Sequence, residues 1–142
     1  MYHQTMFDIY IQFDYLKDHI HKYIYISHEH KDHFDSDFLR SLLNKDFNFI
    51  IPNYKSHVFR DEIYKIPCKK VIECEESDNL KLNDLSIQLF IDDTGINRDS
   101  GIIVSNATTT FLNMNDCKLY DRVSEINLKY PVIDIVAVQF SG

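Results

Sequence analysis

The sequence has little of what breaks, cross-links or anchors a polypeptide. Its 142 residues include three glycines, three prolines and three cysteines, which excludes flexible linkers and a disulfide framework. No apolar run approaches the ~18 residues that a membrane-spanning helix needs. The first ten residues, MYHQTMFDIY, contain no basic stretch followed by an apolar one, unlike a targeting segment. We therefore expect a cytoplasmic protein with reduced thiols and no membrane partner.

Positive charge is scarce as well. There are 15 Lys and Arg residues against 22 Asp and Glu, so the formal net charge is -7. Because surplus negative charge repels phosphate backbones at long range, we expect no nucleic-acid partner, and bound metal ions fit the charge better. The content of hydrophobic residues, 44%, is typical of a globular protein. The length predicts a single domain over residues 1–142.

The order of the apolar segments predicts an α/β fold. Short runs of β-branched and aromatic residues are typical of buried strands, and they alternate with helical periodicity in the first half of the chain. After residue 70 the runs are short and separated by turn residues, which predicts antiparallel pairing. The expected strands are 23–26, 47–51, 71–75, 80–82, 85–91, 101–105, 109–112 and 132–138, and residues 7–15 alternate as an edge strand does before a short helix. Helices are expected from Asp35 or Ser36 through Leu43, over 56–66 and over 118–130.

A dense polar cluster follows the strand at 23–26 directly. It reads Ser27-His28-Glu29-His30-Lys31-Asp32-His33, an HxHxDH pattern. Imidazole nitrogens and a carboxylate oxygen at close spacing form a ligand set for Zn or Fe, and ligands gather where loops leave the carboxyl ends of strands in open α/β sheets. The alternative is a polar surface loop in which His and Asp bond each other and water.

Two segments of the sequence resemble a known family. SHEHKDH after an apolar strand, followed by FDSDFLRSLL, resembles the signature of the metallo-β-lactamase fold superfamily of metallohydrolases. Residues 99–104 with 111–117 resemble the branch containing ascorbate-phosphate lactonase-like hydrolases and CMP-N-acetylneuraminate hydroxylase-type catalytic domains. The resemblance covers residues 20–142. It implies an αβ/βα sandwich that is incomplete at its C-terminal half, so we expect a partial domain whose open sheet a partner chain or a dimer covers.

The resemblance also implies two divalent metal ions, Zn or Fe. His28 and His30 would hold the first ion, Asp32 and His33 the second, and Asp116 would bridge the two. A water or hydroxide lies between the metals in that family, and metal coordination lowers the pKa of such a water to about 7. Asp32 would be the catalytic residue that orients this nucleophile.

The remaining ligands stay open. The family pattern adds one His to each metal, but no His follows Asp116 in this sequence. His57 is the intermediate His, and Asp92 or Asp93 stands at the end of a predicted strand. An Asp ligand would favour a harder metal such as Fe or Mn. Equally, His57 fits a surface position and Asp92-Asp93-Thr94-Gly95 fits a turn.

The expected function is that of a metal-dependent hydrolase. Its metal-bound hydroxide would attack an ester, lactone or phosphoester of a small molecule, such as a sugar phosphate or nucleotide sugar. One alternative is an iron-dependent hydroxylase-type catalytic domain. The sequence lacks the Cys-x-His and Cys-x-x-His pairs of a Rieske cluster, so its electron donor would be a separate domain or protein. A second alternative is a truncated remnant without catalysis.

Overall fold

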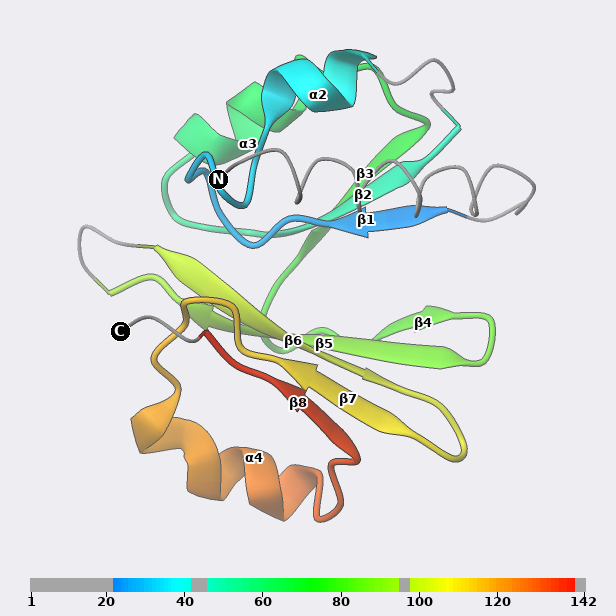
Figure 1. The fold of residues 1–142 in the computed structure, drawn as a ribbon, viewed down its shortest axis with the longest axis vertical. Helices are drawn as coiled ribbons and strands as arrows, with labels where there is room; N and C mark the ends of the chain where they lie inside the picture. Colours follow the sequence, from blue (N-terminus) through cyan, green and yellow to red (C-terminus); the bar gives the residue numbers. More distant parts are fainter. Residues whose placement is uncertain (1–21, 42–45, 95–97, 140–142) are drawn as a thin grey trace, which may run out of the picture.

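The described residues form two β-sheets that are stacked face to face, with helices on both outer sides (Figure 1). The computed structural model describes residues 22–41, 46–94 and 98–139. The strand and helix expected before residue 22 lie outside these ranges. The layers therefore follow the order helix, sheet, sheet, helix, as an αβ/βα sandwich requires.

The first sheet is parallel and has the order β1-β2-β3. Helices α2 and α3 connect its strands and cover its outer face (Figure 1). This is the strand and helix alternation that the sequence predicts. The bounds are β1 Tyr23–Tyr25, α2 Ser36–Ser41, β2 Asn48–Pro52, α3 Val58–Ile63 and β3 Lys70–Cys74.

The second sheet has the order β4-β5-β6-β7-β8. Its pairs are antiparallel up to β7, as the turn residues predict, and only β7 and β8 pair in parallel, with a helical crossover between them. Asn83 adopts a φ of 56° in the turn between β4 and β5. The bounds are β4 Leu80–Leu82, β5 Leu85–Asp92, β6 Asp99–Ser105, β7 Thr110–Asn113, η1 Tyr120–Arg122, α4 Val123–Lys129 and β8 Ile135–Ala137.

Alternating side chains divide the core between the layers. All of β2 is buried, with Phe49 and Ile51 packed among the residues of α2 and α3 while Ile50 packs against the second sheet. On β5, Leu89 belongs to the core between the sheets and Phe90 to the core under α4. Because a strand points successive side chains to opposite faces, one apolar run serves two cores.

Several element bounds differ from the sequence prediction. Helix α3 ends at Ile63 rather than at 66, because the last turn closes with tighter bonds from Lys65 N–H to the Glu62 carbonyl and from Ile66 N–H to the Ile63 carbonyl. The single helix expected over 118–130 is divided into η1 and α4, and the strand expected over 132–138 is three residues long. Asp35, one of the two expected start residues, precedes α2 and caps it, since its Oδ1 accepts the N–H groups of residues 37 and 38.

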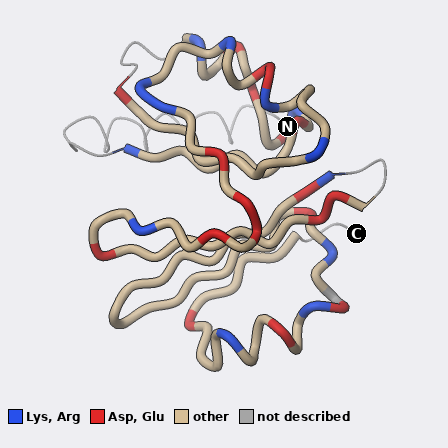
Figure 2. Tube along the Cα trace, turned by 180° about the vertical axis from the view of Figure 1, so that it is seen from behind, with Lys and Arg blue, Asp and Glu red and all other residues tan. Residues whose placement is uncertain are grey.

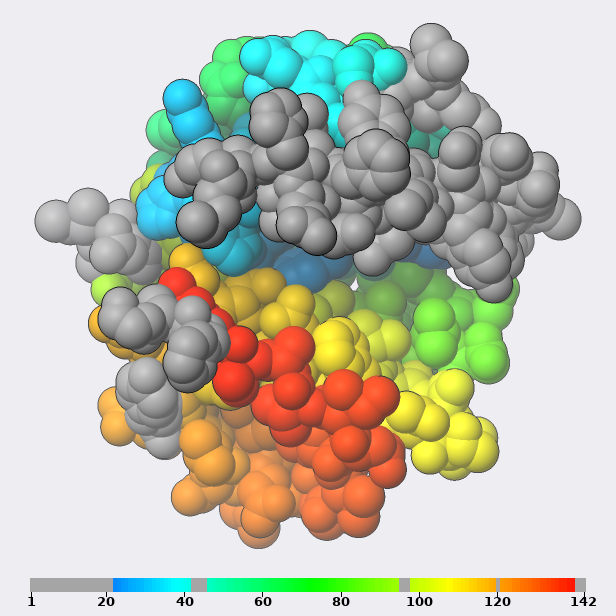
Figure 3. Space-filling model, in the orientation of Figure 1, coloured from blue at the N-terminus to red at the C-terminus, as the bar shows by residue number. Residues whose placement is uncertain are grey.

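Strand β8 lies at the edge of the second sheet and leaves apolar surface exposed (Figure 3). Ile135, Val136 and Val138 are each more than half exposed. Acidic residues gather elsewhere, along the connection from β3 to β4 (Figure 2). Within the described ranges, no helix combines the length and the apolar character needed to span a bilayer.

Candidate metal site

The HxHxDH segment lies in the loop that leaves the carboxyl end of β1. Ile26 N–H still bonds to the Ile50 carbonyl, and the polypeptide then departs from the sheet. A tight turn follows, in which the N–H groups of His33 and Phe34 both bond to the His30 carbonyl. This turn folds Asp32 and His33 back toward His28, so residues adjacent in sequence become a cluster in space.

A first cluster of potential ligands consists of His28, His30 and Asp116. Their ligand atoms all lie within 4.8 Å of one another. His28 Nε2 is 2.9 Å from His30 Nδ1 and 4.0 Å from Asp116 Oδ2, with the two imidazole rings nearly perpendicular. The His28 side chain is only 1% exposed.

A second cluster consists of Asp32, His33 and the same Asp116. His33 Nε2 lies 3.3 Å from Asp116 Oδ2 and 3.5 Å from Asp32 Oδ2. Asp116 thus stands between the two clusters, with one carboxylate oxygen near an imidazole of each. The structure therefore brings together all five residues to which the sequence resemblance gives main ligand roles.

Asp116 reaches the loop because the chain turns sharply after β7. Asn115 adopts a φ of 48°, and its N–H bonds to the Asn113 side chain. Its side-chain amide donates to the Ser100 carbonyl at 2.8 Å, which ties the turn to β6. Asparagine tolerates this left-handed conformation better than most residues, so the local sequence Asn113-Met114-Asn115 suits the turn that positions Asp116.

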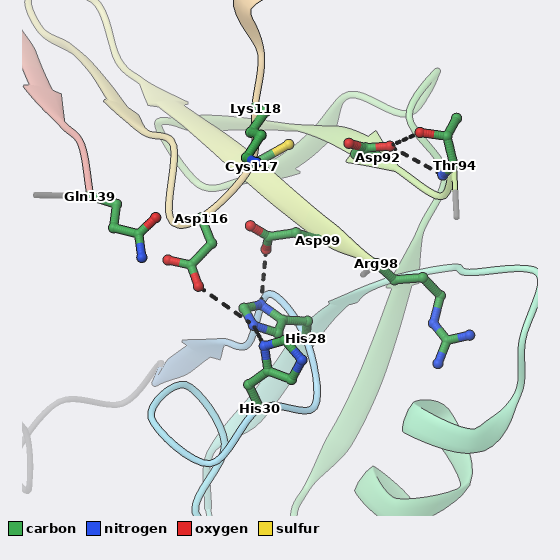
Figure 4. A pocket seen from close by; sticks show the side chains of 10 residues that line it. All are labelled: His28, His30, Asp92, Thr94, Arg98, Asp99, Asp116, Cys117, Lys118 and Gln139. Atoms are coloured by element: carbon green, nitrogen blue, oxygen red, sulfur yellow. Dashed lines mark hydrogen bonds and ion pairs between the residues drawn. The ribbon is translucent and has the colours of Figure 1, made fainter. Parts of the chain in front are cut away.

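Sequence reasoning did not assign a site role to Asp99, which contacts His28 directly (Figure 4). Its Oδ1 lies 2.9 Å from His28 Nδ1, and the carboxylate is 9% exposed. Burial lowers the pKa of His28, but the hydrogen bond and charge of Asp99, with the charges of Asp116 and Asp32, outweigh it and raise that pKa. Asp99 belongs to the second resemblance segment, but its contact with His28 arises only when the two sheets pack.

The other candidate ligands lie outside both clusters. His57 is exposed and precedes the first residue of α3. The Asp93 carboxylate accepts the N–H of Lys55. Asp92 lines the same cavity of about 430 Å³ as His28 and Asp116, but its Oδ1 accepts from the N–H and hydroxyl of Thr94. In this structure both carboxylates therefore accept hydrogen bonds from residues outside the ligand clusters.

The two clusters fit bound metal ions by their chemistry and spacing. All the potential ligand atoms are imidazole nitrogens or carboxylate oxygens, which suit Zn and Fe. Two ligand atoms that share an ion at roughly 2.1 Å lie roughly 3.0 to 3.4 Å apart, for bond angles from 90° to tetrahedral. The 3.3 Å contact falls within this range and those of 2.9 and 3.5 Å lie about 0.1 Å outside it, while the 4.0 Å between His28 Nε2 and Asp116 Oδ2 is longer. Within the part of the chain that the structure describes, neither cluster includes a cysteine.

Comparison with solved structures defines the class of fold. The structure resembles a variant of CmlA β-hydroxylase with a TM-score of 0.70 at 13% identity, over 81% of this chain and 25% of that one. It also resembles the metallo-β-lactamase fold protein YhfI of Bacillus subtilis (TM-score 0.57, 15% identity, 81% and 48% covered). A possible metal-dependent hydrolase of Veillonella parvula gives a TM-score of 0.54 at 14% identity, with 82% and 61% covered. The predicted metallo-β-lactamase-like α/β fold is confirmed.

Sequence comparison gives a different set of relatives. The chain is 34% identical over 129 residues to a Mycolicibacterium smegmatis protein that carries the name of a Rieske 2Fe-2S iron-sulfur protein, with 84% of this chain and 24% of that protein covered. A Mycobacterium tuberculosis protein of the same name is 32% identical over 127 residues, with the same coverage. The chain thus spans about a quarter of the length of these curated relatives. No protein-family model matches it.

The family expected from the two motifs is therefore wrong, although the fold is right. The sequence relatives carry the name of Rieske proteins, and neither a metallohydrolase nor the lactonase-like and CMP-N-acetylneuraminate hydroxylase-type branch appears in those names. The physical reason is that HxHxDH specifies a set of ligand atoms on a loop. Such a set constrains which metals bind, whereas the reaction depends on substrate and electron supply, which the motif does not encode.

Proposed function

We propose that this chain forms the iron-binding catalytic part of a hydroxylase-type oxygenase that receives electrons from a separate donor. The observation that carries the proposal is the position of Asp116 between two groups of nitrogen and oxygen ligands. His28 and His30 would hold one ion, Asp32 and His33 the other, and Asp116 would contact both. The similarity to the CmlA β-hydroxylase and to the Rieske-named proteins supports iron rather than zinc.

The electron donor has to lie outside this chain. A Rieske cluster needs two cysteines and two histidines, but no Cys-x-His or Cys-x-x-His pair occurs in the 142 residues. Cys74 and Cys117 are buried, and burial raises the pKa of the Cys74 thiol to about 11 and of the Cys117 thiol to about 12. The residues present therefore do not fit a 2Fe-2S cluster, and the longer Rieske-named relatives leave room for it in another domain.

The overall reaction consumes dioxygen and two electrons. A C–H bond of the substrate, O2, two electrons and two protons give C–OH and water. Iron held at the clusters would supply the one-electron and dioxygen chemistry. The chain's own residues would hold the metal, and the His28 Nδ1–H would donate to the Asp99 carboxylate. They also form a cavity of about 430 Å³, a size that suits a small-molecule substrate.

The edge of the second sheet supports a larger assembly. Ile135 and Val136 of β8 are exposed, and an exposed apolar edge strand is a site for pairing with further chain. We propose that a partner chain, a second copy or the remainder of a longer protein covers this edge. We propose no nucleic-acid or membrane partner, because the negative net charge repels phosphate groups.

The test is iron binding together with oxygen consumption. Metal-free protein is titrated anaerobically with ferrous ion, and we expect two irons per chain. Reduced protein is then exposed to O2, and its consumption is followed with an electrode. His28→Ala and Asp116→Ala should reduce both signals, while Asp121→Ala, at an exposed position near the site in sequence, should not. Absence of stoichiometric iron in the wild-type protein would refute the proposal, and so would O2-independent hydrolysis of ester substrates with zinc alone.

A further inference from the structure

Three consecutive residues, Arg98 and the first two residues of β6, meet three consecutive residues of the loop after β1. The two segments, 98–100 and 27–29, run in opposite directions, so each residue of one contacts its counterpart in the other. The contacts are Arg98 Nη2 to Glu29 Oε1 at 2.6 Å, Asp99 Oδ1 to His28 Nδ1 at 2.9 Å, and Ser100 Oγ to the Ser27 carbonyl at 3.2 Å. These contacts join the first sheet to the second beside the metal site.

The middle of this pairing is buried, and its outer end is not. Ser100 is fully buried and Asp99 nearly so, whereas the Arg98 and Glu29 side chains are 20% and 31% exposed. Asp99 Oδ1 also accepts the N–H of Ser100 at 2.7 Å. Its Oδ2 is buried with no hydrogen-bond partner among the described residues. A buried carboxylate oxygen without a partner opposes folding, so the favourable contacts of Asp99 are those of Oδ1, to His28 and to the Ser100 N–H.

We propose that Asp99 is a positioning residue of the metal site. It accepts the Nδ1 proton of His28, which leaves Nε2 as the atom directed at His30 and Asp116. Histidines that bind metals commonly donate their other N–H to a carboxylate, which fixes the ring and makes the ligating nitrogen more basic. The inference rests on the proposed function insofar as a metal must bind at the first cluster.

Ser100 extends the same segment to the other side of the site. Its carbonyl accepts the Tyr25 hydroxyl at 2.9 Å and the Asn115 side-chain amide at 2.8 Å. Asn115 precedes Asp116 and forms the turn that positions it. Two adjacent residues of β6 therefore touch both ligand-bearing segments, the loop after β1 through Asp99 and the turn after β7 through Ser100. This makes residues 99–100 the shared support of ligands that lie 88 positions apart in sequence (28 and 116).

The test compares two aspartates that face each other across one ladder. Asp92 and Asp99 are register partners in the β5–β6 pair and line the same cavity, but only Asp99 touches an imidazole. Zn²⁺ and Co²⁺ affinities of metal-free protein are measured by competition with a chelator. We expect Asp99→Asn to lower the affinity for the ion at the first cluster 10–100-fold and to shift the visible absorption of bound Co²⁺. Asp92→Asn removes the same charge and should change affinity by less than about threefold at 0.15 M salt.

The outcomes separate this inference from the proposed function. If the wild-type protein binds no metal, both are overturned. If it binds metal and Asp99→Asn binds equally well with an unchanged Co²⁺ spectrum, only the role of Asp99 is overturned. The same holds if Asp92→Asn weakens binding as much as Asp99→Asn, because the effect would then be one of general charge. Should Asp99→Asn not fold, Asp99→Glu carries the test: it keeps the charge, displaces the carboxylate by one methylene, and should shift the Co²⁺ spectrum.

Discussion

The two ligand clusters share Asp116 but differ in how the protein supports them. In the first cluster His28 is 1% exposed, and its Nδ1 lies 2.9 Å from both Ser27 Oγ and Asp99 Oδ1. In the second cluster the Asp32 side chain is 75% exposed and that of His33 is 22% exposed. The first cluster thus contains one ligand, His28, that buried polar groups hold in place, although its His30 is exposed, whereas the second cluster has no buried ligand.

This difference predicts an order of metal binding. A ligand that is already fixed loses little conformational freedom when an ion binds, whereas an exposed side chain must be immobilised first. The first cluster should therefore bind its ion more tightly, and the second should fill afterwards. It also predicts that His28 matters for folding even without metal, because His28 and its partner Asp99 lie in the interior.

Replacing Asp116 should have the largest effect, because it removes the one residue that both clusters share. We expect Asp116→Ala to abolish binding of the second ion. The affinity for the first ion should fall by more than 10–100-fold, which is the usual loss when a residue that hydrogen-bonds a metal ligand is removed. Isothermal titration with Fe²⁺ or Zn²⁺ measures both steps. Asp121→Ala is the matched control, since it removes an exposed aspartate from the following 3-10 helix. Loss of one ion with the other unchanged would show that Asp116 serves a single cluster.

Replacing one histidine of each cluster should change the unfolding free energy of the protein by different amounts. In metal-free protein, His28→Ala leaves the buried Asp99 carboxylate without its imidazole partner, which we expect to cost roughly 2–4 kcal/mol of unfolding free energy. His33→Ala, at a partly exposed position, should cost less than about 1 kcal/mol. Urea denaturation of both variants measures the difference. Equal losses would mean that the first cluster is no more preorganised than the second.

The resemblance stated above named five residues, and their side chains converge in the structure. Four of them are confined to the HxHxDH loop, whereas the role of Asp116 came from the resemblance alone. The apolar runs also predicted the eight strands of the described residues, closely for β2, which is buried on both faces, and less closely for the exposed β8, which is shorter than expected. Helix ends were less predictable: α3 stops at Ile63, where the switch to tighter backbone bonds leaves the apolar pattern unchanged.

The role of Asp99 could not be predicted in the same way. Its contact with His28 bridges 71 positions in sequence (28 to 99), and it exists only because the start of β6 packs beside the loop after β1. Asp92 and Asp93 were better candidates from sequence alone, as both end a strand, yet their carboxylates bond to backbone N–H groups of Thr94 and Lys55. Nothing in residue spacing distinguishes a carboxylate that ends a turn from one that faces an imidazole on another sheet.

The smallest expected effect concerns a thiol at the wall of the first cluster. Cys117 adjoins Asp116 and is buried, and burial together with the charges of Asp99 and Asp92 raises its pKa to about 12. Cys68, in the other half of the molecule, is partly exposed, and its pKa is raised mainly by burial. Because the thiolate is the reactive form, iodoacetamide should label Cys68 first. Labelling of Cys117 in folded protein should stay slow at pH 7 and rise roughly tenfold per pH unit toward its pKa. Mass spectrometry of the peptides measures both rates.

Addition of urea should remove the difference between the two labelling rates, and His28→Ala should reduce it. Equal rates in the folded wild-type protein would show that the first cluster opens as readily as the surface, and the contrast between the clusters would then fail.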